Sequence, residues 1–300
     1  MAGTIRKASH AGSWYTADGV ILNRELSGWL KTAVESKIRH APARAIIAPH
    51  AGFSYSGPCA AFAYSQIDPS SVKRVFLLGP SHHVHVDGCA LSLCSQYATP
   101  LGNIPIDQKT VAELKATKKF QDMTIATDED EHSLEMHLPY IAKVMESRAG
   151  SYALVPVLVG NINKNKEKEY GEIFRPYLED PSSLFVISSD FCHWGKRFSY
   201  TFTEPAWGEI HESIEKLDRM GMNLIETLNP ADFRAYLDKY GNTICGRNPI
   251  LVLLGTVETV KKNSDKQNLA LKFVQYAQSS PCKTTKDSSV SYASASLTFN

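Results

Sequence analysis

The sequence predicts an α/β fold, a single domain over residues 1–300 with a mostly parallel central sheet, helices on both faces and antiparallel edge strands. Four apolar runs lack polar alternation, which is typical of strands buried on both faces of a parallel sheet. Helical patterns lie between these runs, and no composition break or linker divides the 300 residues, which indicates one domain. The runs lie within the stretches Ala45–Gly52, Arg74–His83, Ala153–Gly160 and Ser183–Gly195.

The segments around the first two runs predict helices. Asp18 can cap a helix, because apolar residues recur at helical spacing after it. The Ala-rich segment Cys59–Gln66 predicts a short helix, and Asp107 can cap another. The run Thr127–Tyr140 predicts the opening of another helix, since its acidic first turn suits the positive helix N-terminus.

The second half of the chain predicts four more helices. The first includes Pro176, which should kink or shorten it. Pro205 can open the second and Asn229 can cap the third. Pro249 fits the first position of a helix over Ile250–Lys261.

Three stretches are expected at the sheet edges. Ala90–Leu93 and Tyr97 predict an edge hairpin. Leu271–Tyr276 and Val290–Phe299 alternate in polarity and predict antiparallel edge strands.

Polar side chains follow three of the four buried runs. His50 follows the first, His82 the second, and Asp190 with His193 the last. Because ligands of such sheets bind beyond the carboxyl ends of the strands, these side chains are expected to converge on one site. Two imidazoles facing one cavity suit a first-row transition metal, which makes His50 and His82 the predicted ligand pair.

The residues leave the third ligand open. Asp190 and Glu135 are carboxylate candidates, and Cys245 is a thiolate candidate. Cys245 precedes a predicted helix, whose positive end would lower the thiol pKa, but it can equally be a buried apolar filler. His193 can act as an acid or base or as a ligand, and Asp190 can orient a histidine. His132 is interpreted as an ordinary packed or surface histidine.

The bulk composition excludes several function classes. The net charge is +1 and no basic block is present, which argues against nucleic acid as a partner. No apolar run is long enough to predict membrane insertion, and no secretory signal is visible at the N-terminus. The six cysteines show no CxxC spacing, which favours a reduced, cytoplasmic protein. Neither a GxSxG nor a Walker A motif is present.

Seven motifs occur in this order along the chain: IIAPHAG, LLGPSHH, EDEHSLEMHLPY, VPVLVG, SSDFCHWG, NTICGR and DSSVSYAS. Together they closely resemble those of the Memo family, mediators of cell motility driven by EGF-receptor-family (ErbB) tyrosine kinases. The resemblance runs from about His10 to the C-terminus. It implies a fold similar to class III extradiol dioxygenases, the non-haem iron enzymes that open catechol rings.

The resemblance also implies roles for individual residues. His50 and His82 match the two histidine metal ligands of those dioxygenases, and His193 matches their acid/base histidine, with Asp190 beside it. Cys245 falls where the dioxygenases place a carboxylate ligand. A thiolate is softer than a carboxylate and can itself be oxidised, so a copper or iron ion is expected, zinc is less favoured, and ring cleavage is not expected.

The resemblance implies a cytoplasmic signalling effector that links activated receptors to motility and the cytoskeleton. Its expected partners are a phosphotyrosine receptor peptide or adaptor proteins, and cytoskeletal regulators. Phosphate recognition usually uses an arginine cluster, and only Lys196, Arg197 and Arg247 lie near the expected cleft. The alternatives are an active metal-dependent oxidoreductase or dioxygenase that uses His50, His82 and Cys245, and a scaffold with an empty pocket.

Overall fold

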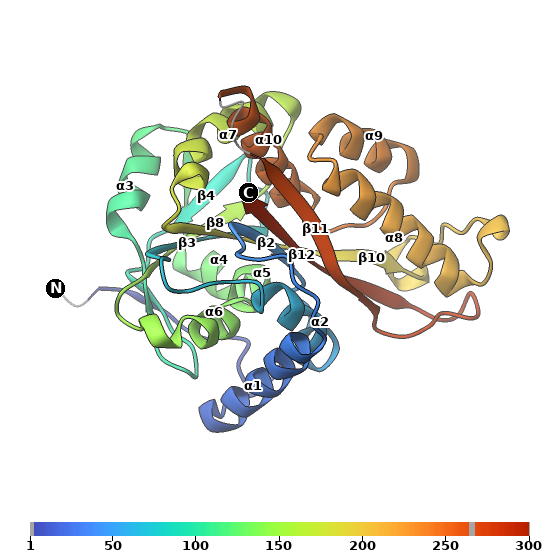
Figure 1. Ribbon diagram of the computed structural model, residues 1–300, viewed down its shortest axis with the longest axis horizontal. Helices are drawn as coiled ribbons and strands as arrows, with labels where there is room; N and C mark the ends of the chain where they lie inside the picture. Colours follow the sequence, from blue (N-terminus) through green and yellow to red (C-terminus); the bar gives the residue numbers. More distant parts are fainter. Residues whose placement is uncertain (1–2, 264–267, 300) are drawn as a thin grey trace.

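A computed structural model describes residues 3–263 and 268–299. Within these residues, nine strands form one mixed sheet, which Figure 1 shows between layers of helices. Its strands, in spatial order, are β10 (Asp190–Trp194), β12 (Ser289–Phe299), β2 (Ala45–Ala48), β9 (Ser183–Ser188), β3 (Arg74–Pro80), β8 (Ala153–Val159), β4 (Cys89–Ser92) and β7 (Phe120–Met123), with β11 (Leu269–Gln278) paired to β12.

The four apolar runs form the parallel centre of this sheet. Strands β2, β9, β3 and β8 are neighbours in this order, and each adjacent pair is parallel. In register, Ala48 lies opposite Ser188, and Leu78 lies opposite Ile187. The predicted α/β class with a mostly parallel centre is therefore confirmed, and the strands that precede His50, His82 and Asp190 end side by side.

Two expectations about the sheet edges are wrong. Strand β12 lies inside the sheet, because it pairs with β11 on one side and with β10 and β2 on the other. Residues 90–93 and Tyr97 form no hairpin, since β4 pairs with β8 and β7. Tyr97 belongs to β5 (Gln96–Tyr97) in a second sheet with β1 (Ile5–Arg6) and β6 (Ile104–Pro105), and its hydroxyl donates to the buried Asp128 carboxylate.

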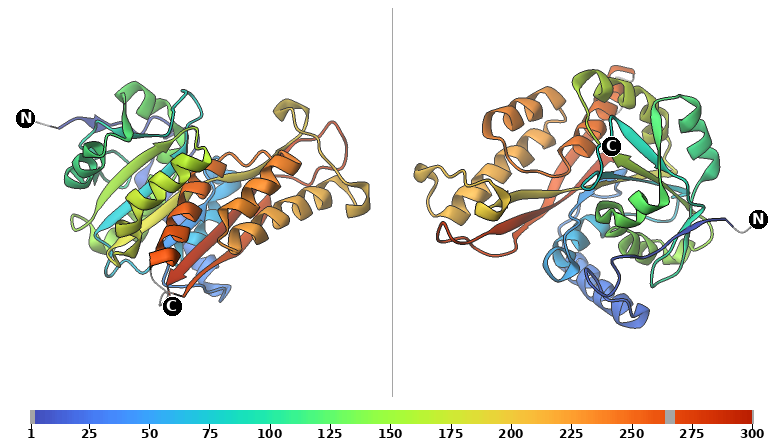
Figure 2. Two further views of the ribbon diagram at one scale, coloured as in Figure 1. Left: turned by 90° about the horizontal axis from the view of Figure 1, so that it is seen from above. Right: turned by 180° about the vertical axis from the view of Figure 1, so that it is seen from behind.

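Helices cover both faces of the main sheet. Helices α7 (Lys164–Glu179) and α10 (Arg247–Asn263) lie side by side on one face, and α1 (Gly19–Glu35) and α2 (Phe53–Tyr64) cover the other (Figures 1 and 2). The predicted helix caps Asp18, Asp107 and Asn229 are confirmed for α1, α3 (Gln108–Ala116) and α9 (Pro230–Tyr240). Among the helices of the described chain, none has the length and apolar character needed to span a bilayer.

Several helix boundaries differ from the expectations. Helix α7 runs through Pro176 to Glu179. Pro205 opens only the short 3₁₀ turn η3 (Pro205–Trp207), and α8 (Ile210–Glu226) begins after it. Helix α10 begins at Arg247, two residues before Pro249. Two further 3₁₀ turns are η1 (Glu146–Arg148) and η2 (Lys196–Phe198).

The expectation that Thr127–Tyr140 opens one continuous helix is wrong. The segment instead contains α4 (Ile125–Asp130), α5 (His132–Glu135) and the start of α6 (Leu138–Val144). Glu131 breaks the run with extended backbone angles (φ −83, ψ 118), and its carboxylate accepts a hydrogen bond from the Ser133 N–H. The break turns this carboxylate towards His82, whose backbone N–H also donates to it.

Candidate functional site

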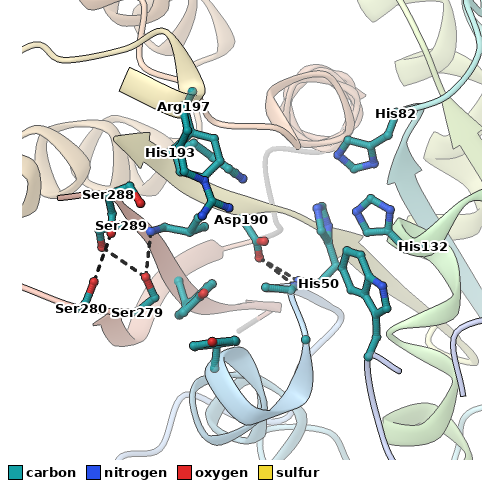
Figure 3. Close-up of a pocket in the computed structure, with 17 residues that line it drawn as sticks. His50, His82, His132, Asp190, His193, Arg197, Ser279, Ser280, Ser288 and Ser289 are labelled. Carbon is teal, nitrogen blue, oxygen red and sulfur yellow. Dashed lines mark hydrogen bonds between the residues drawn. The ribbon is translucent and has the colours of Figure 1, made fainter. Parts of the chain in front are cut away.

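A cavity of about 620 Å³ lies where β2, β9 and β3 end. Figure 3 shows His50, His82 and His132 grouped at one side of it, and His193, Arg197 and four serines at the other. Asp190 lines the cavity as well. The structure thus brings four of the five predicted site residues to one cavity, and the fifth, Cys245, lies directly behind His50.

The ring of His50 is held in one tautomer. Its Nδ1 lies 2.6 Å from the Ser188 hydroxyl, and that hydroxyl donates its single proton to the Ser133 carbonyl at 2.7 Å. Nδ1 must therefore carry the hydrogen and donate it to Ser188, which leaves the lone pair on Nε2. Burial, followed by the neighbouring His82, lowers the pKa of His50 well below its usual range, so the ring is uncharged.

Glu131 holds His82 in the same tautomer. Its Oε1 lies 2.9 Å from His82 Nδ1, and its Oε2 accepts from the His82 backbone N–H at 2.7 Å. Burial alone would raise the pKa of Glu131, but the hydrogen bonds and charge of His82 outweigh burial and lower this pKa to about 2. An ionised carboxylate only accepts, so Nδ1 of His82 donates to Glu131, and Nε2 is the acceptor nitrogen of the ring in its neutral form.

His132 is the member of this group that the sequence interpretation missed. One nitrogen each of His50, His82 and His132 lie within 4.8 Å of one another. The His132 ring stacks on His82, with centroids 4.3 Å apart, and contacts Trp14 at 4.5 Å. Burial lowers its pKa to about 3, so it too is uncharged. Trp14 also lines the cavity.

Cys245 lies next to His50. Its Sγ is 3.1 Å from His50 Nε2, and the Asp190 backbone N–H donates to it at 3.1 Å. Cys245 and His82 also share the lining of a second hollow of about 340 Å³. Burial, followed by the Asp190 charge, raises the pKa of the thiol well above its usual range. The expected lowering of this pKa by a helix N-terminus is wrong, because burial and the Asp190 carboxylate dominate.

Asp190 and His193 lie at the same cavity with different contacts. Asp190 Oδ1 accepts from the backbone N–H groups of His50 at 2.8 Å and Ala51 at 3.3 Å, so it positions the His50 backbone. Ser188 and Glu131, rather than Asp190, hold the imidazole rings. His193 Nδ1 lies 2.9 Å from the Phe191 carbonyl and 3.2 Å from the Thr243 carbonyl. Carbonyls only accept, so His193 also carries its hydrogen on Nδ1.

The carboxylate alternative Glu135 is engaged elsewhere. It is buried and accepts from Arg6 Nη1 at 2.7 Å, from the His10 backbone N–H at 2.8 Å and from the Tyr15 hydroxyl at 2.8 Å. Its oxygens are therefore already bound by the N-terminal segment. His132 has a nitrogen within 4.8 Å of those of His50 and His82, whereas Cys245 contacts His50 and is not part of this group of three.

The donor set fits a transition-metal ion. Imidazole ligands of metals commonly donate their second N–H to a carboxylate or another acceptor, as His50 and His82 do. Imidazole nitrogens with a nearby thiol suit copper, iron or zinc better than magnesium or calcium, which prefer oxygen.

Comparison with known proteins identifies the family. The Memo-like protein family matches residues 6–296. The chain is 56% identical to Protein MEMO1 of Homo sapiens over 295 residues, which covers 98% of each chain. It is 50% identical to the Protein memo-1 homolog of Caenorhabditis elegans, covering 97% of this chain and 82% of the other. An uncharacterized Escherichia coli K12 protein of known structure aligns with a TM-score of 0.49 and 15% identity, covering 83% of this chain and 98% of that one. With the family match over nearly its whole length, the chain belongs to the Memo-like protein family.

Proposed function

We propose that the protein is a signalling effector whose cavity binds a redox-active metal ion, copper or iron. The observation that carries the metal site is the shared tautomer of His50 and His82. Each donates from Nδ1 to a buried acceptor, so each presents an Nε2 lone pair. Histidines held in this way are preorganised ligands, because the ring orientation is set before the metal binds.

The third ligand is Cys245 or His132. Cys245 Sγ already contacts His50 Nε2 at 3.1 Å, and a bound metal ion deprotonates a coordinating thiol despite its raised pKa. His132 offers a nitrogen within 4.8 Å of those of His50 and His82. A copper or iron ion in this place would supply one-electron redox chemistry.

Metal analysis of the purified protein tests the site. Wild type is expected to retain close to one equivalent of copper or iron after dialysis, and His50→Ala and His82→Ala are expected to lose it. Of Cys245→Ser and His132→Ala, the variant that loses metal identifies the third ligand. His211→Ala, on α8 and outside the cavity lining, is the matched control and should retain metal. Metal retention by both His50→Ala and His82→Ala would contradict the site.

The signalling role rests on family membership. The proposed role is to link activated EGF-receptor-family kinases to cell motility in the cytoplasm, with a phosphotyrosine receptor peptide or adaptor proteins and cytoskeletal regulators as partners. Cells depleted of their own Memo protein provide the test. Wild type should restore ligand-stimulated migration and the metal-free His50→Ala variant should not. Equal rescue by both would separate signalling from the metal site.

A metal-dependent oxidoreductase is the second candidate, and His193 is the observation that favours it. Its Nδ1–H is bound by two backbone carbonyls, so its Nε2 can accept a proton from a molecule in the same cavity. Oxygen uptake by metal-loaded protein with a panel of catechols tests this. Uptake that His193→Gln abolishes, with metal content unchanged, would establish the enzyme.

A further inference from the structure

The N-terminal strand carries an arginine that is completely buried. Arg6 of β1 is 0% exposed, and it pairs in register with Tyr97 of β5. A guanidinium stays charged at physiological pH, so its burial is unfavourable unless hydrogen-bond acceptors surround it. Arg6 lies outside the proposed set of metal ligands, so the acceptors around it indicate what it does.

The acceptors of Arg6 lie on both sides of the helix break at Glu131. Its Nε–H is shared between the carbonyl and the Oδ1 of Asp128, both at 2.9 Å. Its Nη2 donates to the Glu131 carbonyl at 3.0 Å, and its Nη1 donates to Glu135 Oε2 at 2.7 Å. One side chain therefore binds the last turn of α4, the break itself and the last residue of α5.

These hydrogen bonds favour the break over a continuous helix. In a continuous helix the Asp128 carbonyl would accept from the N–H four residues later. Because α4 ends two residues after Asp128, this carbonyl needs another donor, and Arg6 supplies it. The Asp128 carboxylate is fixed in turn by the hydroxyls of Tyr97 at 2.7 Å and Ser92 at 2.6 Å. The end of α4 is thus bound to β1, β4 and β5.

The break places two side chains of the histidine site. The Glu131 carboxylate faces His82, whose Nδ1 and backbone N–H it binds. His132 follows directly and stacks on the His82 ring, with centroids 4.3 Å apart. Among the described residues, Arg6 forms no hydrogen bond with an imidazole. It therefore acts on the site through the backbone of Glu131.

The residues that follow Arg6 hold the same short helix. The His10 N–H donates to Glu135 Oε1 at 2.8 Å, so Glu135 is bound by both Arg6 and His10. The Trp14 ring lies 4.5 Å from the ring of His132. The N-terminal segment, residues 6–14, therefore contacts both the first and the last residue of α5.

We infer that Arg6 is a positioning residue for the proposed metal site, through which the N-terminal segment holds Glu131 and His132 against His82. Groups that orient metal ligands before the metal binds raise the affinity of the site without touching the metal. The inference rests on the proposed function, because it concerns how the ligands of the proposed site are held.

Competition between the protein and a chelator for copper(I) tests the inference. Arg6→Met should weaken copper binding by about 10- to 100-fold, the usual effect of losing a group that supports a metal ligand. Arg74→Met is the matched control, because Arg74 also pairs with two carboxylates, those of Asp107 and Asp180. Arg74 lies at the start of β3, the end of the strand opposite to His82, so this variant should change the affinity less than twofold.

Two further variants separate positioning from the cost of leaving buried carboxylates unpaired. The triple variant R6M/D128N/E135Q removes all three charges together, so it should be more stable than Arg6→Met and yet still bind copper weakly. Arg6→Lys keeps the charge without the planar fork of donors, so it should restore only part of the affinity. Wild-type affinity in the triple variant would overturn the inference, because no donor at residue 6 would then be needed.

Nitrogen NMR of the histidine rings gives a second measurement, which uses the metal-free protein. At a pH where the ring is neutral, His82 should show only the Nδ1–H tautomer in wild type and Arg74→Met, because Glu131 accepts from Nδ1. Arg6→Met should show a mixture of tautomers, and His82→Ala identifies the signals.

The two measurements distinguish the inference from the proposed function. Identical His82 spectra in wild type and Arg6→Met, or equal losses of affinity in Arg6→Met and Arg74→Met, would overturn the role of Arg6. Absence of copper binding by wild type would contradict the proposed metal site, and the tautomer of His82 would still decide whether Arg6 positions Glu131.

Discussion

At the scale of single residues, His50, His82 and His193 share one feature. Each ring donates from Nδ1 to a different acceptor: the Ser188 hydroxyl, the Glu131 carboxylate and the Phe191 and Thr243 carbonyls. Each Nε2 is therefore the acceptor atom of the neutral ring. Of these acceptors, only Glu131 carries a charge, so it is the one whose replacement should change ligand strength most.

Glu131→Gln is expected to weaken metal binding by about 10- to 100-fold, the usual effect of losing the carboxylate that supports a histidine ligand. Gln can still accept from the Ser133 N–H, so the start of α5 should persist. Competition with a chelator measures the affinity, and circular dichroism checks the fold. Asp130→Asn, an exposed neighbour with the same loss of charge, is the control. Equal affinities in the two variants would mean that Glu131 has no role in the metal site.

The sequence predicted the residues whose place depends on strands. His50, His82, Asp190 and His193 follow buried apolar runs, and parallel strands bring their carboxyl ends together. His132 could not be predicted in this way, because it reaches the cluster only after the helix break at Glu131. That break depends on hydrogen bonds between Glu131 and His82, which are 49 residues apart. Cys245 was placed by the family resemblance, whereas its pKa depends on burial that the motif does not reveal.

At the scale of elements, the order of the strands explains which side chains meet at the cavity. Strand β9 lies between β2 and β3, so Ser188 at its end can bind the ring of His50. The four central strands were predictable from their unbroken apolar character. The position of β12 was not predictable, because its alternating serines are typical of an edge strand. They pack inside the sheet instead, where Ser294 Oγ donates to the Cys59 carbonyl.

The close contact between helices α7 and α10 predicts how a substitution at Gly171 changes stability. A Cβ on Gly171 of α7 would lie 2.7 Å from the Gly255 carbonyl oxygen of α10, so the two backbones touch. Gly171→Ala should therefore destabilise the protein by about 1–3 kcal/mol, as overpacking usually does. Gly28→Ala is the control, because a Cβ at this position of α1 meets nothing within 4 Å. It should stabilise the protein by about 0.5–1 kcal/mol, since Ala favours helix.

Denaturant unfolding of both variants measures the difference in free energy. Opposite signs for Gly171→Ala and Gly28→Ala are the expected result. Stabilisation by both substitutions would show that α7 and α10 can separate at no cost, and that the close approach of their backbones does not constrain this face of the sheet.

At the scale of the whole molecule, stability in acid depends on buried ionisable groups that have opposite effects on the folded state as the pH falls. Burial raises the pKa of Asp218 to about 6, so this group favours the folded state as the pH falls from about 6 towards 3.8. Burial lowers the pKa of His137 to about 3, so this group opposes folding over a similar range. His137 lies outside the imidazole cluster, and its Nδ1 is 2.7 Å from the Tyr64 hydroxyl.

The effect of His137 on stability follows from the difference between its pKa values in the unfolded and the folded protein. In the unfolded chain a histidine binds a proton below a pKa of about 6.5, whereas His137 in the folded protein does so only at about 3. Between these values the unfolded state binds more protons, so acid lowers the free energy of unfolding by up to about 1.4 kcal/mol per pH unit. The double variant Y64F/H137L removes this contribution, while Tyr64→Phe alone keeps the buried histidine. Denaturant unfolding between pH 6 and pH 4 measures how the free energy of unfolding changes with pH. This slope should be about 1 kcal/mol per pH unit smaller in the double variant than in Tyr64→Phe. Equal slopes would mean that His137 is protonated in the folded protein.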